Sequence, residues 1–163
     1  MRTLSKEELK RLYDKDFPLW AEINLQPLKE KAYDLVDWEN LLEEIEDMTK
    51  RDLDACISQL ARILEHLYKW DNFRSLAGGE CAGKDWIKSI REARDEIRAM
   101  FKEYPSLKNK LPLELGRAWI RAQVKLRKWL LKNDYEPDES NIPEKCPYTY
   151  EEAINRDLKR ELK

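Results

Sequence analysis

The amino-acid sequence predicts an all-α protein, a single-domain bundle of about six or seven helices with short connections over residues 1–163. Charged residues make up 39% of the 163 residues and only four glycines interrupt them, a composition that favours helices over sheets. Apolar residues recur at helical spacing along most of the chain, and no strand-like alternation is long enough to assign. A chain of this length is expected to form one domain with a substantial core.

The first helices are indicated by their capping residues. Ser5 and Glu8 form a capping-box pattern that opens a short helix. Asp16 can cap a second helix with Pro18 in its first turn, where the missing N–H does no harm. Pro27 is expected to kink or end this second helix.

A third helix is predicted to begin after Asp37. Its apolar stripe consists of Trp38, Leu41, Leu42, Ile45 and Met48. Thr49 with Asp52 offers a fresh helix start, so we expect a break or bend near Met48. From there to Trp70 one face stays apolar, formed by Leu53, Ile57, Leu60, Leu64 and Leu67.

Three further helices are predicted in the second half of the chain. One ends before Pro105 and carries Trp86, Ile90, Ala93, Ile97 and Met100. Another runs from about Pro112 to Lys132 and has a core face of Leu115, Trp119, Ala122, Leu126 and Trp129. After a loop with Pro137, Pro143 and Pro147, Thr149 and Glu152 form a second capping box that starts a last short helix.

The stretch "GGECAGKD", residues 78–85, resembles a phosphate-binding loop but lacks its context. Leu60, Leu64 and Leu67 predict a helix before the loop, whereas the phosphate-binding motif follows a strand. Asp85 stands where the motif has a Ser or Thr, and its carboxylate would repel the phosphates. We interpret Gly78, Gly79 and Gly83 as a flexible turn between two helices and predict no nucleotide cofactor.

Several segments together resemble a known family. They are "DFPLWAEINLQPLKE", "LVDWENLLEEIEDM", "HLYKW", "WIKSIREARDEI", "YPSLKNKLP" and "IPEKCPYTYEEAINRDL", in this order from about Phe17 to Leu158. In combination they resemble the domain-of-unknown-function family twenty-nine. The resemblance implies a helical fold and supplies no activity.

The net charge and the cysteines indicate which partners and which cellular compartment to expect. The net charge of −2 gives no general attraction to nucleic acid or to a membrane. The segment "MRTLSKEELKRLY" has no apolar run, so we expect neither a signal peptide nor a membrane anchor. Cys56, Cys81 and Cys146 fit neither a disulfide framework nor paired zinc ligands, and we expect free thiols in the cytoplasm.

An acidic segment and a single histidine are the candidates for a metal or catalytic site. Residues 37–47 hold six acids and no base, and Glu39, Glu43 and Glu46 share one helical face. Glu39, Glu43 and His66 form a candidate polar site, yet no Glu-x-x-His pair accompanies them and His66 falls away from the apolar stripe. With one histidine and no nucleophile elbow, we predict no metal and no catalytic residue, and an enzyme with a conventional active site is the third hypothesis, after the two named below.

The strongest candidate for a functional surface is a basic helix. Residues 117–132 hold six bases and no acid. The stripe on one side of this helix is formed by Arg117, Arg121, Lys125, Lys128 and Lys132. Such a stripe can contact phosphates, pair with the acidic segment within one molecule or between two, or be an ordinary solvated face.

Two functions remain open on this evidence. The preferred hypothesis is a non-enzymatic helical protein-interaction module that associates with itself or with a protein partner. The alternative is a nucleic-acid-associated protein, such as a nuclease-like or toxin–antitoxin component, that uses the basic helix around residues 117–132. The six tryptophans are interpreted as core residues whose indole N–H groups find a carboxylate or carbonyl, not as base-stacking platforms.

Overall fold

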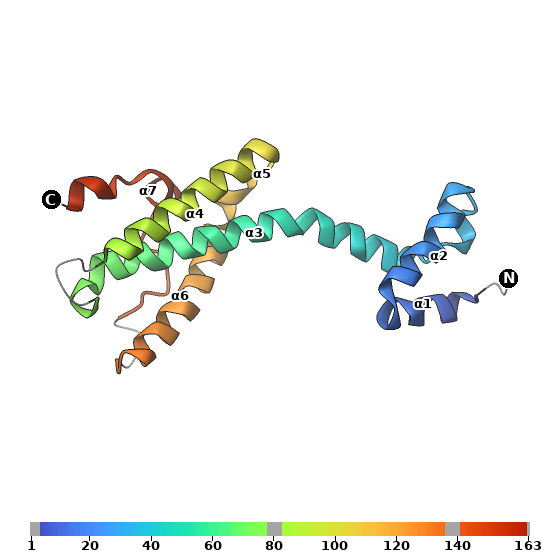
Figure 1. Ribbon diagram of the computed structural model, residues 1–163, viewed down its shortest axis with the longest axis horizontal. Coiled ribbons are helices and arrows are strands. Elements are labelled where there is room, and N and C mark those ends of the chain that lie inside the picture. The colour runs from blue at the N-terminus through green and yellow to red at the C-terminus, as the bar shows by residue number, and fades with distance from the viewer. Residues whose placement is uncertain (1–3, 78–82, 136–140, 163) are drawn as a thin grey trace. The chain divides into compact units, whose positions relative to one another are not determined.

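A computed structural model describes residues 4–77, 83–135 and 141–162 (Figure 1). Every regular element in these ranges is helical, so the all-α prediction is confirmed. The α-helices are α1 (Lys6–Lys15), α2 (Phe17–Lys29), α3 (Trp38–Asn72), α4 (Lys84–Glu103), α5 (Leu107–Lys110), α6 (Leu115–Lys132) and α7 (Tyr150–Asn155). Short 3-10 helices are η1 (Tyr33–Leu35), η2 (Arg74–Leu76), η3 (Leu111–Glu114) and η4 (Leu158–Leu162).

The chain divides into two compact units, Met1–Lys50 and Arg51–Lys163. The first unit holds α1, α2, η1 and the start of α3. The second holds the rest of α3 together with α4, α5, α6 and α7. That residues 1–163 form one domain stays a prediction.

The first unit has a small core around one tryptophan. The indole N–H of Trp20 donates to Asp37 Oδ2 at 3.0 Å. Asn24 is also buried, and its Oδ1 accepts from the backbone N–H of Asp37 at 2.8 Å. Leu9 and Val36 complete the buried apolar residues of this unit. Asn24 and Asp37 are both buried, and both side chains accept hydrogen bonds, as buried polar groups usually do.

The second unit has a larger core formed mainly by α3, α4 and α6, which run beside one another in Figure 1. Its fully buried side chains include Leu60, Leu64, Leu67, Ile90, Ile97, Trp119, Leu126 and Leu130. These residues belong to the predicted apolar faces, apart from Leu130. The helical spacing therefore predicted correctly which sides of α3, α4 and α6 turn inward.

Helix boundaries follow the predicted caps at most positions. Both capping boxes are formed, at Ser5 with Glu8 and at Thr149 with Glu152. Asp16 caps α2, and this helix ends at Lys29, two residues after Pro27. The fresh helix start predicted at Thr49 is wrong, because α3 is continuous from Trp38 to Asn72.

The glycine-rich stretch follows a helix, as expected. α3 and η2 precede it, and α4 begins directly after Gly83. Gly83 is left-handed, with φ +83°. Gly78 and Gly79 lie outside the described residues, so only the ends of the predicted turn can be compared.

The C-terminal segment is fixed to the end of α3 by a polar cluster. The Asp71 carboxylate accepts two hydrogen bonds from the Arg156 guanidinium, at 2.7 and 2.8 Å, and one from the Tyr148 hydroxyl at 2.6 Å. Burial opposes the charge of Asp71, but these donors hold its pKa below its usual value.

None of the helices that the structure describes combines the length and apolar composition needed to span a membrane.

Candidate interaction surface

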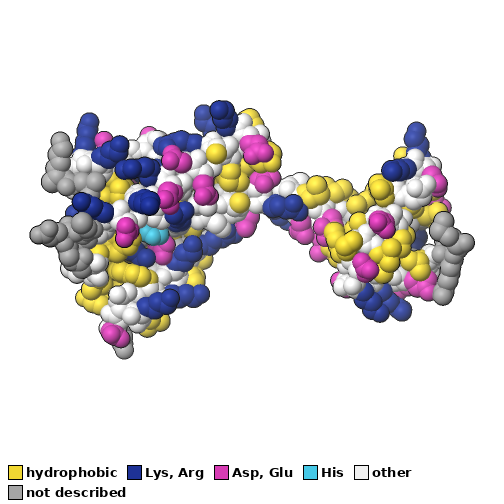
Figure 2. Space-filling view, in the orientation of Figure 1, with side chains coloured by type: hydrophobic (Ala, Val, Ile, Leu, Met, Phe, Trp, Pro, Cys, Tyr) yellow, Lys and Arg dark blue, Asp and Glu magenta, His cyan; other side chains and the backbone are white. Residues whose placement is uncertain are grey.

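Helix α6 separates a buried face from a charged face. Ala118, Trp119, Ala122, Leu126 and Leu130 are buried against the rest of the second unit. The residues predicted to form the basic stripe lie on the remaining surface of the helix. Figure 2 shows Lys and Arg side chains together with hydrophobic ones in the region of α6.

The two arginines of the stripe are already engaged. Arg121 is not a solvent-facing residue: its guanidinium forms an ion pair with Asp54 and donates to Ser58 Oγ at 2.9 Å, both on α3. Arg117 lies 3.5 Å from the Glu114 carboxylate. Arg121 therefore holds α6 against α3, a role that a helical projection of the sequence alone does not reveal.

The three lysines of the stripe are available. Lys125, Lys128 and Lys132 are exposed, and none has a hydrogen-bond or ion-pair partner among the residues the structure describes. The charge of Lys125 is close enough to contribute to lowering the pKa of Lys69, after the larger effect of burial. These lysines are the part of the predicted stripe that can meet a partner.

An exposed apolar row beside the lysines was missed by sequence reasoning. Ile120, Val124 and Leu131 are 62%, 45% and 59% exposed. Their spacings of four and seven place them on one side of α6. The signal was present in the sequence, because these residues lie opposite the core face of Trp119 and Leu126. We call Ile120, Val124 and Leu131 with Lys125, Lys128 and Lys132 the outer face of α6.

The acidic segment of the first unit, like the outer face of α6, combines exposed apolar residues with exposed charged ones, here of negative charge. Leu42, Ile45 and Met48 at the start of α3 are 54%, 48% and 59% exposed, although the sequence predicted an apolar stripe here. Beside them, the carboxylates of Glu43, Glu46 and Asp47 are exposed and have no hydrogen-bond or ion-pair partner among the described residues. These six residues lie within two turns and extend around most of the circumference of α3; we call them together the acidic face of α3.

The other acids of this segment have local partners. Lys10 on α1 contacts Glu39 at 2.6 Å. The Tyr13 hydroxyl donates to Glu44, and this hydrogen bond is the main cause that raises the pKa of Tyr13 to about 12. Asp37 bonds to Trp20. These contacts hold α1 and α2 against α3 and leave the acidic face open.

The candidate polar site of Glu39, Glu43 and His66 is divided between the two units. Glu39 and Glu43 belong to the first, and His66 belongs to the second. The Nδ1 atom of His66 lies 2.7 Å from the Arg62 carbonyl oxygen, to which it can donate. In the described part of the chain, no three His, Cys, Asp or Glu side chains gather as metal ligands would.

A buried ion pair next to His66 was also missed. Glu65 and Lys69 are buried and lie 3.3 Å apart, one turn from each other on α3. Lys69 Nζ also lies over Trp129, 4.6 Å from the ring centroid. Burial lowers the pKa of Lys69 and also that of His66. Within the core each charge of the pair stabilises the other, and the pair lies next to Trp129 on α6.

Together these features define a class of protein: an all-α chain with charged and apolar helix faces. The chain belongs to the family described as Domain of unknown function DUF29, whose model matches residues 12–158. The resemblance noted from the sequence is therefore confirmed. Neither the curated proteins nor the solved structures gave a match.

Proposed function

We propose that this protein is a helical interaction module that associates with a second copy of itself. The observation that supports this most strongly is the pair of complementary faces: apolar residues beside unpaired lysines on α6, and apolar residues beside unpaired acids on α3. Each copy carries both faces. Two copies can therefore form two equivalent contacts around a two-fold axis, as closed homodimers do.

The apolar residues would supply most of the binding free energy. Ile120, Val124 and Leu131 on one copy would cover Leu42, Ile45 and Met48 on the other. Apolar surface that leaves water contributes roughly 25 cal/mol per Å² before the costs of association. Exposed apolar rows on helices are surfaces that helix-in-groove and helix-to-helix contacts commonly use.

The charges would determine which faces meet. Three lysines opposite three acids attract at close range, whereas lysine face against lysine face or acid against acid is repelled. Exposed pairs of this kind contribute little affinity and are screened by salt. We therefore expect the association to weaken as ionic strength rises, without disappearing.

Binding to nucleic acid through the lysines of α6 is the alternative that the test must separate. The net charge of −2 and the exposed acids Glu43, Glu46 and Asp47 oppose a general attraction to phosphate backbones.

A cytoplasmic setting is part of the proposal. It is supported by Cys56 and Cys146, which are free thiols as expected in a reducing compartment.

The first test measures mass in solution as a function of concentration. Analytical ultracentrifugation of the full chain is expected to show a reversible dimer. Replacing Lys125, Lys128 and Lys132 by Glu should weaken this dimer by about tenfold or more, because three attractive pairs become repulsive at each contact. The matched control replaces the exposed residues Lys84, Lys88 and Lys145 by Glu, which changes the net charge equally and should leave the dimer intact.

Three results would contradict the proposal. One is a monomer at all concentrations. Another is a dimer that the two triple variants weaken equally. The third is binding of duplex DNA or RNA near physiological salt that the α6 triple variant abolishes and the control variant does not, which would favour the nucleic-acid alternative.

A further inference from the structure

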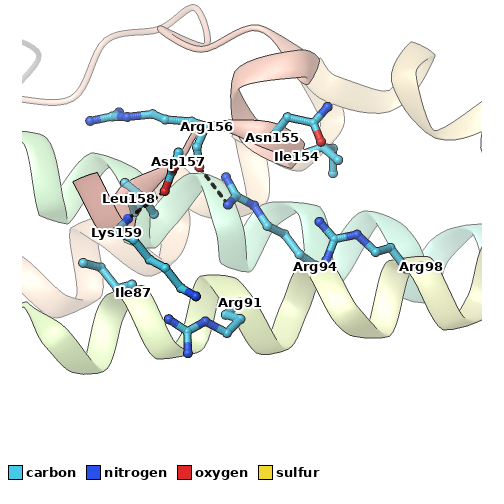
Figure 3. Close-up of a pocket in the computed structure, with 10 residues that line it drawn as sticks. All are labelled: Ile87, Arg91, Arg94, Arg98, Ile154, Asn155, Arg156, Asp157, Leu158 and Lys159. Carbon is cyan, nitrogen blue, oxygen red and sulfur yellow. Dashed lines mark hydrogen bonds between the residues drawn. The ribbon is translucent and has the colours of Figure 1, made fainter. Parts of the chain in front are cut away.

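A second surface, separate from the outer face of α6, lies between α4 and the C-terminal segment. It is a cavity of about 510 Å³ whose walls come from α4 on one side and from the end of α7 and η4 on the other (Figure 3). Among the described residues its walls include the side chains of Arg91, Arg94, Arg98 and Lys159 and one acid, Asp157, whereas Arg156 lines it but directs its side chain elsewhere. Such an excess of one charge around a hollow favours an oppositely charged ligand.

Arg94 forms the floor of this site and is held by carbonyl groups. Its Nε donates to the Ala153 carbonyl at 2.9 Å, and its terminal nitrogens donate to the carbonyls of Arg156 at 2.9 Å and Glu152 at 3.3 Å. None of these partners carries a formal negative charge. Burial lowers the pKa of Arg94, the nearby charges of Arg98 and Arg156 lower it further, and the Asp157 carboxylate opposes this lowering in part. The positive potential at the floor of the cavity is therefore not neutralised by a direct ion pair.

Two more cations face the cavity without a partner. Arg91 on α4 and the Lys159 ammonium have no hydrogen-bond or ion-pair partner in the described part of the chain. In Figure 3 the side chain of Lys159 extends from η4 towards Arg91. Two like charges that approach one hollow from opposite walls repel each other unless an anion lies between them.

The acids near the cavity are engaged elsewhere. Asp157 accepts from the Lys159 backbone N–H at 3.0 Å and lies 3.4 Å from Arg160. Asp95 pairs with Arg98 at 3.0 Å. The Arg156 side chain leaves the cavity to bind Asp71 and Glu161. Arg91, Arg94 and Lys159 are thus the groups free to meet a ligand's charge, with Arg98 beside them.

An apolar extension adjoins the cationic cavity. A second hollow of about 670 Å³ shares Arg94, Arg98, Ile154 and Asn155 with the first. It continues along α4 to Phe101 and is also lined by Tyr150 on α7, and Lys102, Lys108 and Glu151 are among its polar lining residues. Both volumes fall within the range of about 300 to 1,000 Å³ that small-molecule sites occupy. The two hollows are adjacent because they share these four lining residues, and we call them together the groove.

We infer that this groove binds a small amphipathic anion, with its phosphate or carboxylate group between Arg91, Arg94 and Lys159 and its apolar body along Phe101, Tyr150 and Ile154. Guanidinium groups bind phosphate and carboxylate through two parallel hydrogen bonds. Arg91 has all its donors available, and Arg94 uses three of its five on carbonyls. The assignment is independent of self-association, because it uses none of the residues of the outer face of α6 or the acidic face of α3.

The test is isothermal titration calorimetry of the full chain with three probes: inorganic phosphate, phenyl phosphate and phenylpropanoate. We expect one saturable site, with phenyl phosphate or phenylpropanoate binding more tightly than inorganic phosphate because the ring enters the second hollow. Whichever of the two organic anions binds more tightly identifies the headgroup. The double variant Arg91→Gln, Lys159→Gln should weaken binding by about tenfold or more, since each charged hydrogen bond is substantial.

The matched control removes two exposed charges outside the groove. Lys84→Gln with Lys145→Gln should leave the affinity within about twofold, because neither residue lines the groove and exposed charges are screened. The inference is overturned if none of the probes gives saturable binding, if inorganic phosphate binds as tightly as both organic anions, or if the control variant loses as much affinity as the Arg91 and Lys159 variant.

Discussion

Gly83 occupies a backbone conformation that side chains rarely adopt. Its φ of +83° lies in the left-handed region, directly before the first turn of α4. A Cβ atom at this position would stand 2.7 Å from two ring atoms of Trp70, closer than packed atoms approach. Trp70 is buried, so it has little room to move. Both the backbone angle and the contact require glycine here.

We therefore predict that Gly83→Ala lowers the free energy of unfolding by about 2–3 kcal/mol, through left-handed strain and steric overlap. Gly116 on α6 is the matched control, since an added Cβ there meets nothing within 4 Å. Gly116→Ala should be neutral or stabilising by up to about 1 kcal/mol. Urea unfolding of both variants measures the difference. Equal effects of the two substitutions would contradict the role assigned to Gly83.

The tryptophans illustrate what can be read from single residues. The indole N–H groups of Trp20, Trp38 and Trp119 donate to Asp37, to the Tyr33 carbonyl and to the Pro143 carbonyl. That such partners exist could be predicted for these three, because a buried N–H is costly if unpaired. The prediction is wrong for Trp70, whose buried indole N–H has no hydrogen-bond partner among the described residues. Which partner each one finds depends on tertiary contacts that no local pattern encodes.

At the scale of helices, the capping rules predicted correctly the helix starts that depend only on residues close in the sequence. The capping boxes lie within four residues, and both form as the sequence predicted. At Thr49 the same rule failed. Its hydroxyl donates to the Glu46 carbonyl at 2.7 Å within a continuous helix and does not cap a new one. A threonine can bond in either way, and the sequence pattern does not distinguish them.

The attachment of the C-terminal segment lies beyond such rules. Asp71 and Arg156 are far apart in the sequence, and nothing local links them. In the structure, Arg156 bridges Asp71 and Glu161, while Tyr148 donates to Asp71. Burial, and after it the hydrogen bond to Asp71, raises the pKa of Tyr148, so the hydroxyl remains protonated and a donor. This cluster fixes the position of α7 and η4, which form one wall of the cationic groove.

We predict that Asp71→Asn lowers the free energy of unfolding by about 2 kcal/mol at neutral pH, the range of charged hydrogen bonds. Because the folded-state pKa of Asp71 is lowered, its contribution is fully present above its unfolded value and is lost as pH falls through the folded one. The difference between the variant and the unaltered protein should therefore shrink below about pH 4.

The control for this cluster is Arg160→Ala. Arg160 is 87% exposed and lies 3.4 Å from Asp157, so its loss should cost no more than about 0.5 kcal/mol. Urea unfolding at several pH values measures both variants. A pH-independent cost for Asp71→Asn would show that the charge of Asp71 is not what matters.

At the scale of the whole molecule, the sequence located a basic stripe on α6. It did not show which residues of that stripe lack an ion-pair partner among the described residues. The stripe from Arg117 to Lys132 was recognised from composition and spacing. Its division into the engaged Arg121 and the unpaired lysines depends on the packing of α6 against α3. Likewise, the stripe of Leu42, Ile45 and Met48 was predicted, but its exposure in the first unit was not.

The charges of the whole chain nearly cancel, with a net value of −2, but they are unevenly distributed. α6 carries bases without acids, and the first turns of α3 carry acids without bases. A near-neutral protein with separated charges has little general attraction to polyanions, yet it can recognise a complementary face. This distribution is the central reason for proposing a second copy as the partner.

A charge-exchange experiment tests this claim most directly. In one variant, Lys125, Lys128 and Lys132 are replaced by Glu; in the other, Glu43, Glu46 and Asp47 are replaced by Lys. Each variant alone should dimerise about tenfold or more weakly than the unaltered chain, because like charges meet at both contacts. An equimolar mixture should form a heterodimer by sedimentation velocity, because both contacts then pair opposite charges. If the mixture sediments as two monomers, the α6 face does not bind the acidic face of a second copy.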